Sequence, residues 1–173
     1  APGDILIGVA SSGLHSNGFS LVRKVLLEHA GLSLDQFLPE LGCTLGEELL
    51  KPTIIYVPLI LPLLRRYELK GIAHITGGGL ELNLPRILPA GLKALLRKKS
   101  WEVPPVFPFI QKYGHVEERE MFRTFNMGIG MVLVTAPEIS ALVLEQIRST
   151  GEKAWEIGLI AEKKGDEQGV EIL

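Results

Sequence analysis

The stretch ASSGLHSNGFSL, residues 10–21, joins an apolar run to a pattern of helical spacing and decides the fold around it. The run that leads into it, Ile5–Ala10, is almost continuously apolar and predicts a buried strand. After it, apolar residues beginning with Phe19 and Val22 recur at helical spacing, and Gly31 offers a place for that helix to end. The stretch is therefore expected to be a strand-to-helix turn.

Small and hydrogen-bonding residues fill this first turn. Ser16 or Asn17 is a good helix N-cap, and the first N–H groups of a helix have no partner inside it. Free N–H groups and the helix dipole both favour an anion, so we expect a bound anion here, with His15 as a candidate catalytic group. The candidate substrate contacts are Ser12, Gly13, Ser16, Asn17 and Gly18. The alternative is a glycine-rich connector that needs only backbone freedom.

A second turn of the same kind follows the predicted strand Lys70–Thr76. Thr76 is expected to cap a short helix that Pro85 ends. His74, just before the glycines, is a candidate acid–base group, with a buried structural imidazole as the alternative. The candidate substrate contacts of this turn are Thr76, Gly77, Gly78, Gly79 and Asn83. Two such turns, each beside a histidine, favour a site for a small phosphorylated ligand.

The rest of the pattern predicts short helices and strands in irregular alternation. The expected helices are Leu45–Leu50, one from Pro58, Pro108–Tyr113, Glu117–Phe122 and Pro137–Ser149, and the expected strands are Leu92–Lys98, Asn126–Thr135, Ala154–Ala161 and Val170–Leu173. We expect the final strand to pair with the one before it. In the helix from Pro137, the buried stripe is expected to be Ile139, Leu142, Val143 and Ile147. This order favours one α+β domain over residues 1–173, a mixed β-sheet covered by helices.

Asn126 opens a glycine-bearing strand and is a further candidate substrate contact. A role in stabilising a turn is the alternative. Gly128 and Gly130 lack side chains on one face of this strand, so we expect another backbone or a ligand to approach them closely.

Composition excludes several classes of protein. The formal net charge of −2 gives no electrostatic case for binding nucleic acid. The single cysteine, Cys43, excludes an internal disulfide and predicts no metal site. No leader segment is visible, and no apolar run is long enough to span a bilayer, so we expect no membrane partner and a cytoplasmic location.

Four motifs resemble the phosphoribosylformylglycinamidine cyclo-ligase family, also called the aminoimidazole ribonucleotide synthetases. In chain order they are Ser11–Leu21, His74–Gly79, Ser100–Pro105 and Arg123–Met131. Together the motifs span nearly the whole chain. One position departs from the family pattern, which places Glu-Asn after the second turn. Here Leu82 precedes Asn83, and the glutamate is Glu81.

The resemblance implies a partly ferredoxin-like fold and an enzyme of purine biosynthesis. In this family ATP and Mg²⁺ activate the formyl oxygen of formylglycinamidine ribonucleotide, and ring closure gives aminoimidazole ribonucleotide. The resemblance also implies that this chain is the C-terminal half, that an absent N-terminal half binds ATP, and that the full enzyme is a homodimer. The isolated domain is then expected to be inactive. The alternatives are another ATP-using synthetase or kinase of the same superfamily, or a non-catalytic phosphate-binding module.

Overall fold

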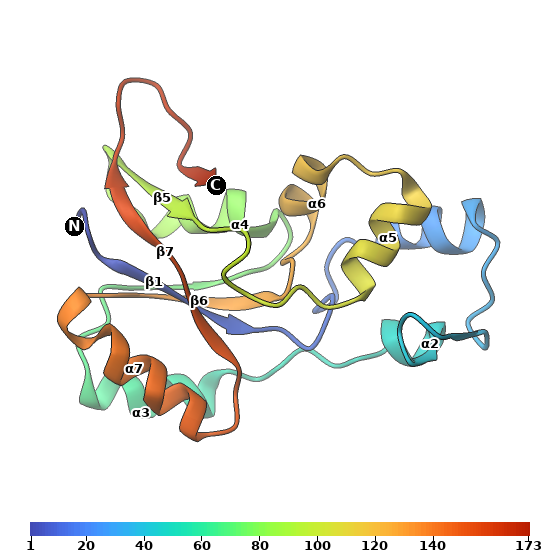
Figure 1. The fold of residues 1–173 in the computed structure, drawn as a ribbon, viewed down its shortest axis with the longest axis horizontal. Coiled ribbons are helices and arrows are strands. Elements are labelled where there is room, and N and C mark those ends of the chain that lie inside the picture. Colours follow the sequence, from blue (N-terminus) through green and yellow to red (C-terminus); the bar gives the residue numbers. More distant parts are fainter.

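The computed structural model describes residues 1–173 and contains one six-stranded sheet with helices on both faces (Figure 1). The strands of this sheet are β1 (Ile5–Ala10), β4 (Gly71–His74), β5 (Leu92–Leu96), β6 (Ile129–Thr135), β7 (Ala154–Glu162) and β8 (Val170–Ile172). A separate two-stranded ribbon consists of β2 (Phe37–Leu38) and β3 (Cys43–Thr44). The α-helices are α1 (Phe19–Val22), α2 (Leu45–Leu49), α3 (Val57–Arg66), α4 (Gly79–Asn83), α5 (Val106–Gly114), α6 (Glu118–Thr124) and α7 (Pro137–Ser149). A π-helical segment, Arg23–His29, continues α1, and a 3₁₀ turn, Leu84–Ile87, continues α4.

The order of strands in the large sheet is β4-β6-β1-β7-β5-β8. All neighbours are antiparallel except β5 and β8, which are parallel, so the predicted mixed sheet and the α+β class are confirmed. The expected pairing of the last strand is wrong, because β8 pairs with β5 and not with β7. The loop after β7 carries the chain across to the far side of β5, so nearness in sequence does not give the neighbour.

β1 is buried on both faces, and this explains its unbroken apolar run. Leu6 belongs to the larger core, which lies between one face of the sheet and α4 and continues beyond the sheet among α6, α5 and the segment Arg23–His29. Ile7 and Val9 point the other way and belong to a smaller core under α3 and α7. Figure 1 shows α3 and α7 together on one side of the sheet.

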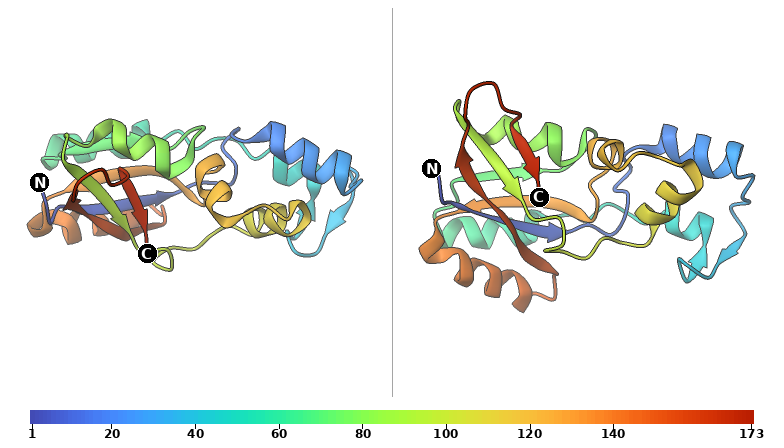
Figure 2. Two further views of the ribbon diagram at one scale, coloured as in Figure 1. Left: turned by 90° about the horizontal axis from the view of Figure 1, so that it is seen from above. Right: turned by 45° about the horizontal axis from the view of Figure 1, so that its top comes forward.

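The molecule is elongated, with the sheet at one end and an arm at the other (Figure 2). The arm contains α1 and its π-helical continuation, α2 and α5. The predicted helix at Leu45–Leu50 is confirmed, and its N-terminus is a capping box in which the Glu47 side chain accepts from the Thr44 N–H at 2.8 Å. The stripe predicted for α7 is wrong at Leu142, which is 51% exposed. No helix in the structure is long and apolar enough to span a bilayer.

The topology brings three connections to one end of the sheet. β1 and β4 both run antiparallel to β6, so they are parallel to each other and end on the same side. The turns that follow β1 and β4 therefore lie beside the segment that precedes β6. This end of the sheet is where the candidate site residues gather.

Candidate functional site

The first glycine turn, Ser11–Gly18, contains several residues with left-handed backbone conformations. His15 and Ser16 have positive φ angles of 51° and 60°, which is uncommon for residues with side chains. The N-cap of α1 is Gly18, at φ 71°, with no side-chain cap, so the expected capping by Ser16 or Asn17 is wrong. The Asn17 side chain instead donates to the His15 carbonyl at 3.0 Å.

Several backbone N–H groups of the first glycine turn have no partner in the chain. The N–H groups of Gly13, Leu14, His15 and Ser16 donate no hydrogen bond, whereas the N–H of Asn17 donates to the Leu14 carbonyl at 3.1 Å. Of the predicted contacts in this turn, Ser16 is exposed and the Ser12 hydroxyl donates to the Pro52 carbonyl at 2.6 Å. The turn thus presents free donors, as an anion site requires.

A buried asparagine braces this turn from the far end of the chain. Asn126 is 0% exposed, and its amide nitrogen donates to the Gly13 carbonyl at 2.9 Å. Its side-chain oxygen accepts from the Ser11 hydroxyl at 3.0 Å and from the Gly128 N–H at 2.8 Å. The Asn126 amide is therefore engaged inside the protein, so the structure favours the turn-stabilising alternative for this residue.

His15 lies inside the first glycine turn and is only 4% exposed. Its Nε2 accepts from the Ser12 N–H at 3.0 Å and from the Ile54 N–H at 3.3 Å. An imidazole nitrogen that accepts two N–H donors carries no proton, so the neutral ring is protonated at Nδ1. This buried Nδ1 has no hydrogen-bond partner. Burial, with the nearby charge of His74, lowers the pKa of His15 to about 4, so the ring is neutral at physiological pH.

Tyr56 stands between the two histidines. Its ring centroid is 6.0 Å from that of His15 and 6.1 Å from that of His74. Its hydroxyl donates to the Ala10 carbonyl at 2.6 Å, and burial raises the pKa of the phenol, which keeps it protonated. A Cβ on Gly130 would collide with this hydroxyl and lie 2.7 Å from His15 Cε1. A close approach is present at Gly130, but the side chains of Tyr56 and His15 make it, and not the backbone or ligand that was expected.

The second glycine turn, Thr76–Gly79, resembles the first in design. Gly78, at φ 99°, is the N-cap of α4, so the expected capping by Thr76 is wrong. The N–H groups of Thr76, Gly77 and Gly78 donate no hydrogen bond in the chain. Asn83, also buried, braces this turn, and its amide nitrogen donates to the Gly79 carbonyl at 2.7 Å and to the Thr76 carbonyl at 3.3 Å.

The two glycine turns meet. A Cβ on Gly77 would lie 3.9 Å from Asn17 Oδ1, with no other atom within 4 Å, so Gly77 faces open space beside the first turn. Gly18 and Gly79 both lie against Phe125. A Cβ on Gly18 would collide with its ring, and a Cβ on Gly79 would collide with its carbonyl oxygen. Only residues without a side chain allow these contacts. The structure thus brings the two predicted groups of substrate contacts together.

His74 lies at the rim of this site and is exposed, in contrast to His15. It lines a hollow of about 340 Å³ whose other eight lining residues are apolar, among them Ile55 and Leu61. No group of side chains in the chain has a composition and spacing that could hold a metal ion.

The sequence interpretation missed an ion pair at the mouth of the first glycine turn. Glu48 is buried and accepts from Lys51 Nζ at 2.5 Å. The other carboxylate oxygen of Glu48 lies 3.4 Å from the position of a Cβ on Gly13. Glu48 lies on α2 and Lys51 just after it, more than 30 residues from Gly13 in the sequence. Only the folded structure shows that this ion pair lies beside the first glycine turn. Ser11 and Tyr56 were missed for the same reason.

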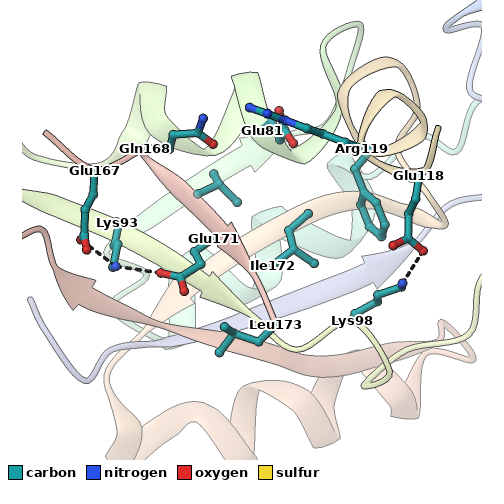
Figure 3. A pocket seen from close by; sticks show the side chains of 12 residues that line it. Glu81, Lys93, Lys98, Glu118, Arg119, Glu167, Gln168, Glu171, Ile172 and Leu173 are labelled. Carbon is teal, nitrogen blue, oxygen red and sulfur yellow. Dashed lines mark hydrogen bonds and ion pairs between the residues drawn. The ribbon is translucent and has the colours of Figure 1, made fainter.

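The largest cavity lies elsewhere, between β8 and helices α4 and α6 (Figure 3). It has a volume of about 660 Å³, and no residue of either glycine turn lines it. Two of its three cations are paired: Lys93 pairs with Glu167 at 2.7 Å and with Glu171 at 2.8 Å, and Lys98 pairs with Glu118. Glu81, which stands one position earlier than the glutamate of the family pattern, lines this cavity as well. Its side chain therefore points away from the glycine turns, toward a separate charged surface.

Comparison with known proteins agrees with this architecture. Residues 1–170 match the family described as AIR synthase related protein, C-terminal domain. The chain is 53% identical over 171 residues to a phosphoribosylformylglycinamidine cyclo-ligase from Citrifermentans bemidjiense, covering 99% of this chain and 49% of the relative. A cyclo-ligase of the same name from Caldicellulosiruptor bescii is 55% identical over 166 residues, covering 95% and 48%. The chain thus spans about half the length of the curated relatives it matches.

Solved structures share the fold at low sequence identity. A thiamine-monophosphate kinase from Stenotrophomonas maltophilia superposes with a TM-score of 0.63 at 20% identity, covering 99% of this chain and 50% of that one. The hydrogenase maturation protein HypE from E. coli superposes with a TM-score of 0.64 at 21% identity, covering 99% and 47%. At these identities the likeness concerns the fold alone.

Proposed function

The chain belongs to the AIR synthase related protein family as its C-terminal domain, and we propose that it is the substrate-binding and catalytic C-terminal domain of a phosphoribosylformylglycinamidine cyclo-ligase. The observation that carries the proposal is the meeting of two glycine turns, with free N–H groups on both, at one end of the sheet. Such donors suit the phosphate of a ribonucleotide, because they are fixed in place before the ligand arrives.

The proposed reaction closes the imidazole ring of formylglycinamidine ribonucleotide. The formyl oxygen takes the terminal phosphoryl group of ATP and becomes a good leaving group. An amidine nitrogen then attacks the formyl carbon, the C–O bond breaks, and inorganic phosphate leaves with the oxygen while the nitrogen loses a proton. The products are aminoimidazole ribonucleotide, ADP and phosphate. The resemblance supports ATP and Mg²⁺ use and a homodimer. The resemblance also implies that the other half of the protein holds most of the Mg²⁺ contacts.

The two histidines receive different roles in this proposal. His15 is neutral, and its Nε2 accepts from the Ser12 and Ile54 N–H groups, so it holds the first turn in shape. Its buried Nδ1–H donates to a ligand oxygen if ligand binding uncovers it. His74 is exposed at the rim and is placed to accept the proton that the attacking nitrogen loses. Asn83 and Asn126 hold the two turns in shape and act as positioning residues.

Gly77→Ala in the full-length protein tests whether the ligand occupies the space between the turns. A Cβ at Gly77 meets no atom closer than 3.9 Å and Gly77 needs no left-handed backbone, so the fold tolerates it. If the ligand lies against Gly77, calorimetry with formylglycinamidine ribonucleotide should show an affinity loss of about tenfold, equivalent to about 1.4 kcal/mol. The melting temperature should stay unchanged.

The wild-type measurement decides between the candidate functions. Binding of formylglycinamidine ribonucleotide, with ring closure in the presence of ATP, supports the cyclo-ligase. Binding of another phosphorylated acceptor but not of this one would favour a different ATP-using synthetase or kinase. Binding of phosphate alone, without turnover, would favour a non-catalytic module.

A further inference from the structure

We propose that the outer side of α3 and the open edge of β4 form the docking surface for the half of the protein that precedes this chain in full-length relatives. The α3 docking face consists of Ile55, Val57, Leu61 and Leu64, with the adjoining edge of β4. This inference rests on the proposed function, because it places the ATP-using half against the same site.

Helix α3 is apolar on both sides from Val57 to Leu64, and its last two residues, Arg65 and Arg66, are exposed cations. Its inward side buries Leu59, Ile60 and Leu63 in the smaller core. Its outward side carries Leu61, which is 48% exposed, and Val57 and Leu64, which are similarly exposed. A surface helix normally presents polar residues to water, and a helix that is apolar all round is normally buried. The outer side of α3 therefore has the composition of an interface.

The residues before α3 extend this surface. Ile55 is 78% exposed although it is a large aliphatic residue. It forms one wall of the hollow of about 340 Å³ that also borders Ile72 on β4. A continuous exposed apolar patch with a hollow at its centre is typical of a surface that another protein segment covers.

The backbone of β4 offers a second kind of contact at the same place. β4 has β6 as its one neighbour in the sheet, so its other edge has no strand beside it. Exposed edges of this kind are usually covered in the complete protein. The apolar side chains and the open edge lie together, since Ile72 of β4 borders the hollow.

The preceding half is the occupant that fits best. The family model describes a C-terminal domain, and the curated relatives are about twice as long as the part matched here. In a protein of that plan the preceding half joins at Ala1. Asp4 lies close to that point and accepts from Lys70 Nζ at 2.5 Å, and Lys70 directly precedes β4. The junction thus enters beside the docking face, and a linked half can reach it without a long connection.

Docking there would also complete the site. His74 lines the same hollow as Ile55 and Leu61, so a domain seated on the α3 docking face would lie against the exposed imidazole. His15 stays on the inner side of Tyr56. The preceding half then closes the site from the side of His74, where the phosphoryl donor is needed.

Hydrogen–deuterium exchange on the full-length protein tests this inference. The variant Ile55→Asp with Leu61→Asp places two charges in the proposed interface, and Leu142→Asp places one at an equally exposed site on α7 as the control. We expect the double variant to speed exchange of the β4 amides and of a segment in the preceding half by about tenfold or more, while the control leaves both unchanged. Unchanged exchange in the double variant would overturn the proposal.

Two further readouts separate the remaining outcomes. If the double variant changes the sedimentation mass and leaves contacts between the halves intact, the face belongs to a second copy and the proposal is wrong. If the exchange result holds but the wild-type protein does not bind formylglycinamidine ribonucleotide, the docking surface stands and the proposed function fails. Val57→Glu serves as the replacement variant if the double variant melts at a lower temperature.

Discussion

The two glycine turns are built alike but are braced over very different distances along the chain. Each follows a strand, begins a short helix with a left-handed glycine and is held by one buried asparagine. Asn126 braces the first turn across 113 residues, at Gly13, whereas Asn83 braces the second across 4 residues, at Gly79. The first turn also holds its histidine inside, and the second leaves its histidine at the rim. Similar local sequences thus give a first turn whose histidine is buried and a second turn whose histidine is exposed.

Gly79→Ala should have the largest effect, because a side chain there collides with the backbone of Phe122 and Phe125 at the end of α6. Gly79 has a φ of 57°, and a Cβ there would lie 2.6 Å from the Phe125 carbonyl oxygen. Backbone cannot move aside cheaply, so we expect a loss of about 4 kcal/mol in the free energy of unfolding, measured by urea denaturation. Gly77→Ala is the matched control and should unfold like the wild type. Equal stability of both variants would show that the turns do not pack as described.

Asn126→Ala should cost about 3 kcal/mol, because it leaves the Gly13 carbonyl and the Gly128 N–H with fewer or no partners in a dry interior. Denaturant unfolding measures the loss, and exchange of the β6 amides locates it. A loss below about 1 kcal/mol would mean that the first turn keeps its shape without this brace.

Acid should destabilise the first turn through His15. The unfolded ring takes up a proton as the pH falls through 6.5, whereas the folded ring resists until about 4, so stability is full above 6.5 and declines between these values. The loss attributable to His15 reaches about 3 kcal/mol at the lower end. Urea denaturation over this range should show a steeper slope in the wild type than in His15→Phe, because carboxyl groups with a lowered pKa, such as Asp4, titrate in both proteins. NMR should also find the neutral ring protonated at Nδ1.

Asn83→Ala should have the smallest effect, about 1 to 2 kcal/mol, because only its bond to the Gly79 carbonyl is short, at 2.7 Å. Its bonds to the Thr76 and Gly77 carbonyls are long, and the turn is partly open to water. The affinity for formylglycinamidine ribonucleotide should fall more clearly than the stability does. Calorimetry and urea denaturation on the same variant separate the two effects. A larger stability loss than that of Asn126→Ala would reverse the comparison between the turns.

Local patterns predicted much of the fold and the place of the site. A buried strand and a glycine-rich turn are each encoded by residues adjacent in the sequence, so β1 and the two glycine turns could be predicted. The helix caps were predicted wrongly, because left-handed glycines hold positions that Asn17 and Thr76 were expected to take. Contacts between segments that are distant in the sequence could not be predicted. The bracing role of Asn126, the Glu48–Lys51 pair and the pairing of β8 all depend on segments that meet only in three dimensions.

The position of β1 has a consequence for how the protein is made. Among the strands of this domain β1 is synthesised first, yet its two partners, β6 and β7, belong to the last third of the given sequence. During synthesis, more than 100 further residues must therefore be added before either neighbour of this strand exists, although both of its faces are apolar. Nascent chains should for that interval be the form most exposed to aggregation and to capture by chaperones. The first glycine turn can take its final shape only after its brace, Asn126, has been translated.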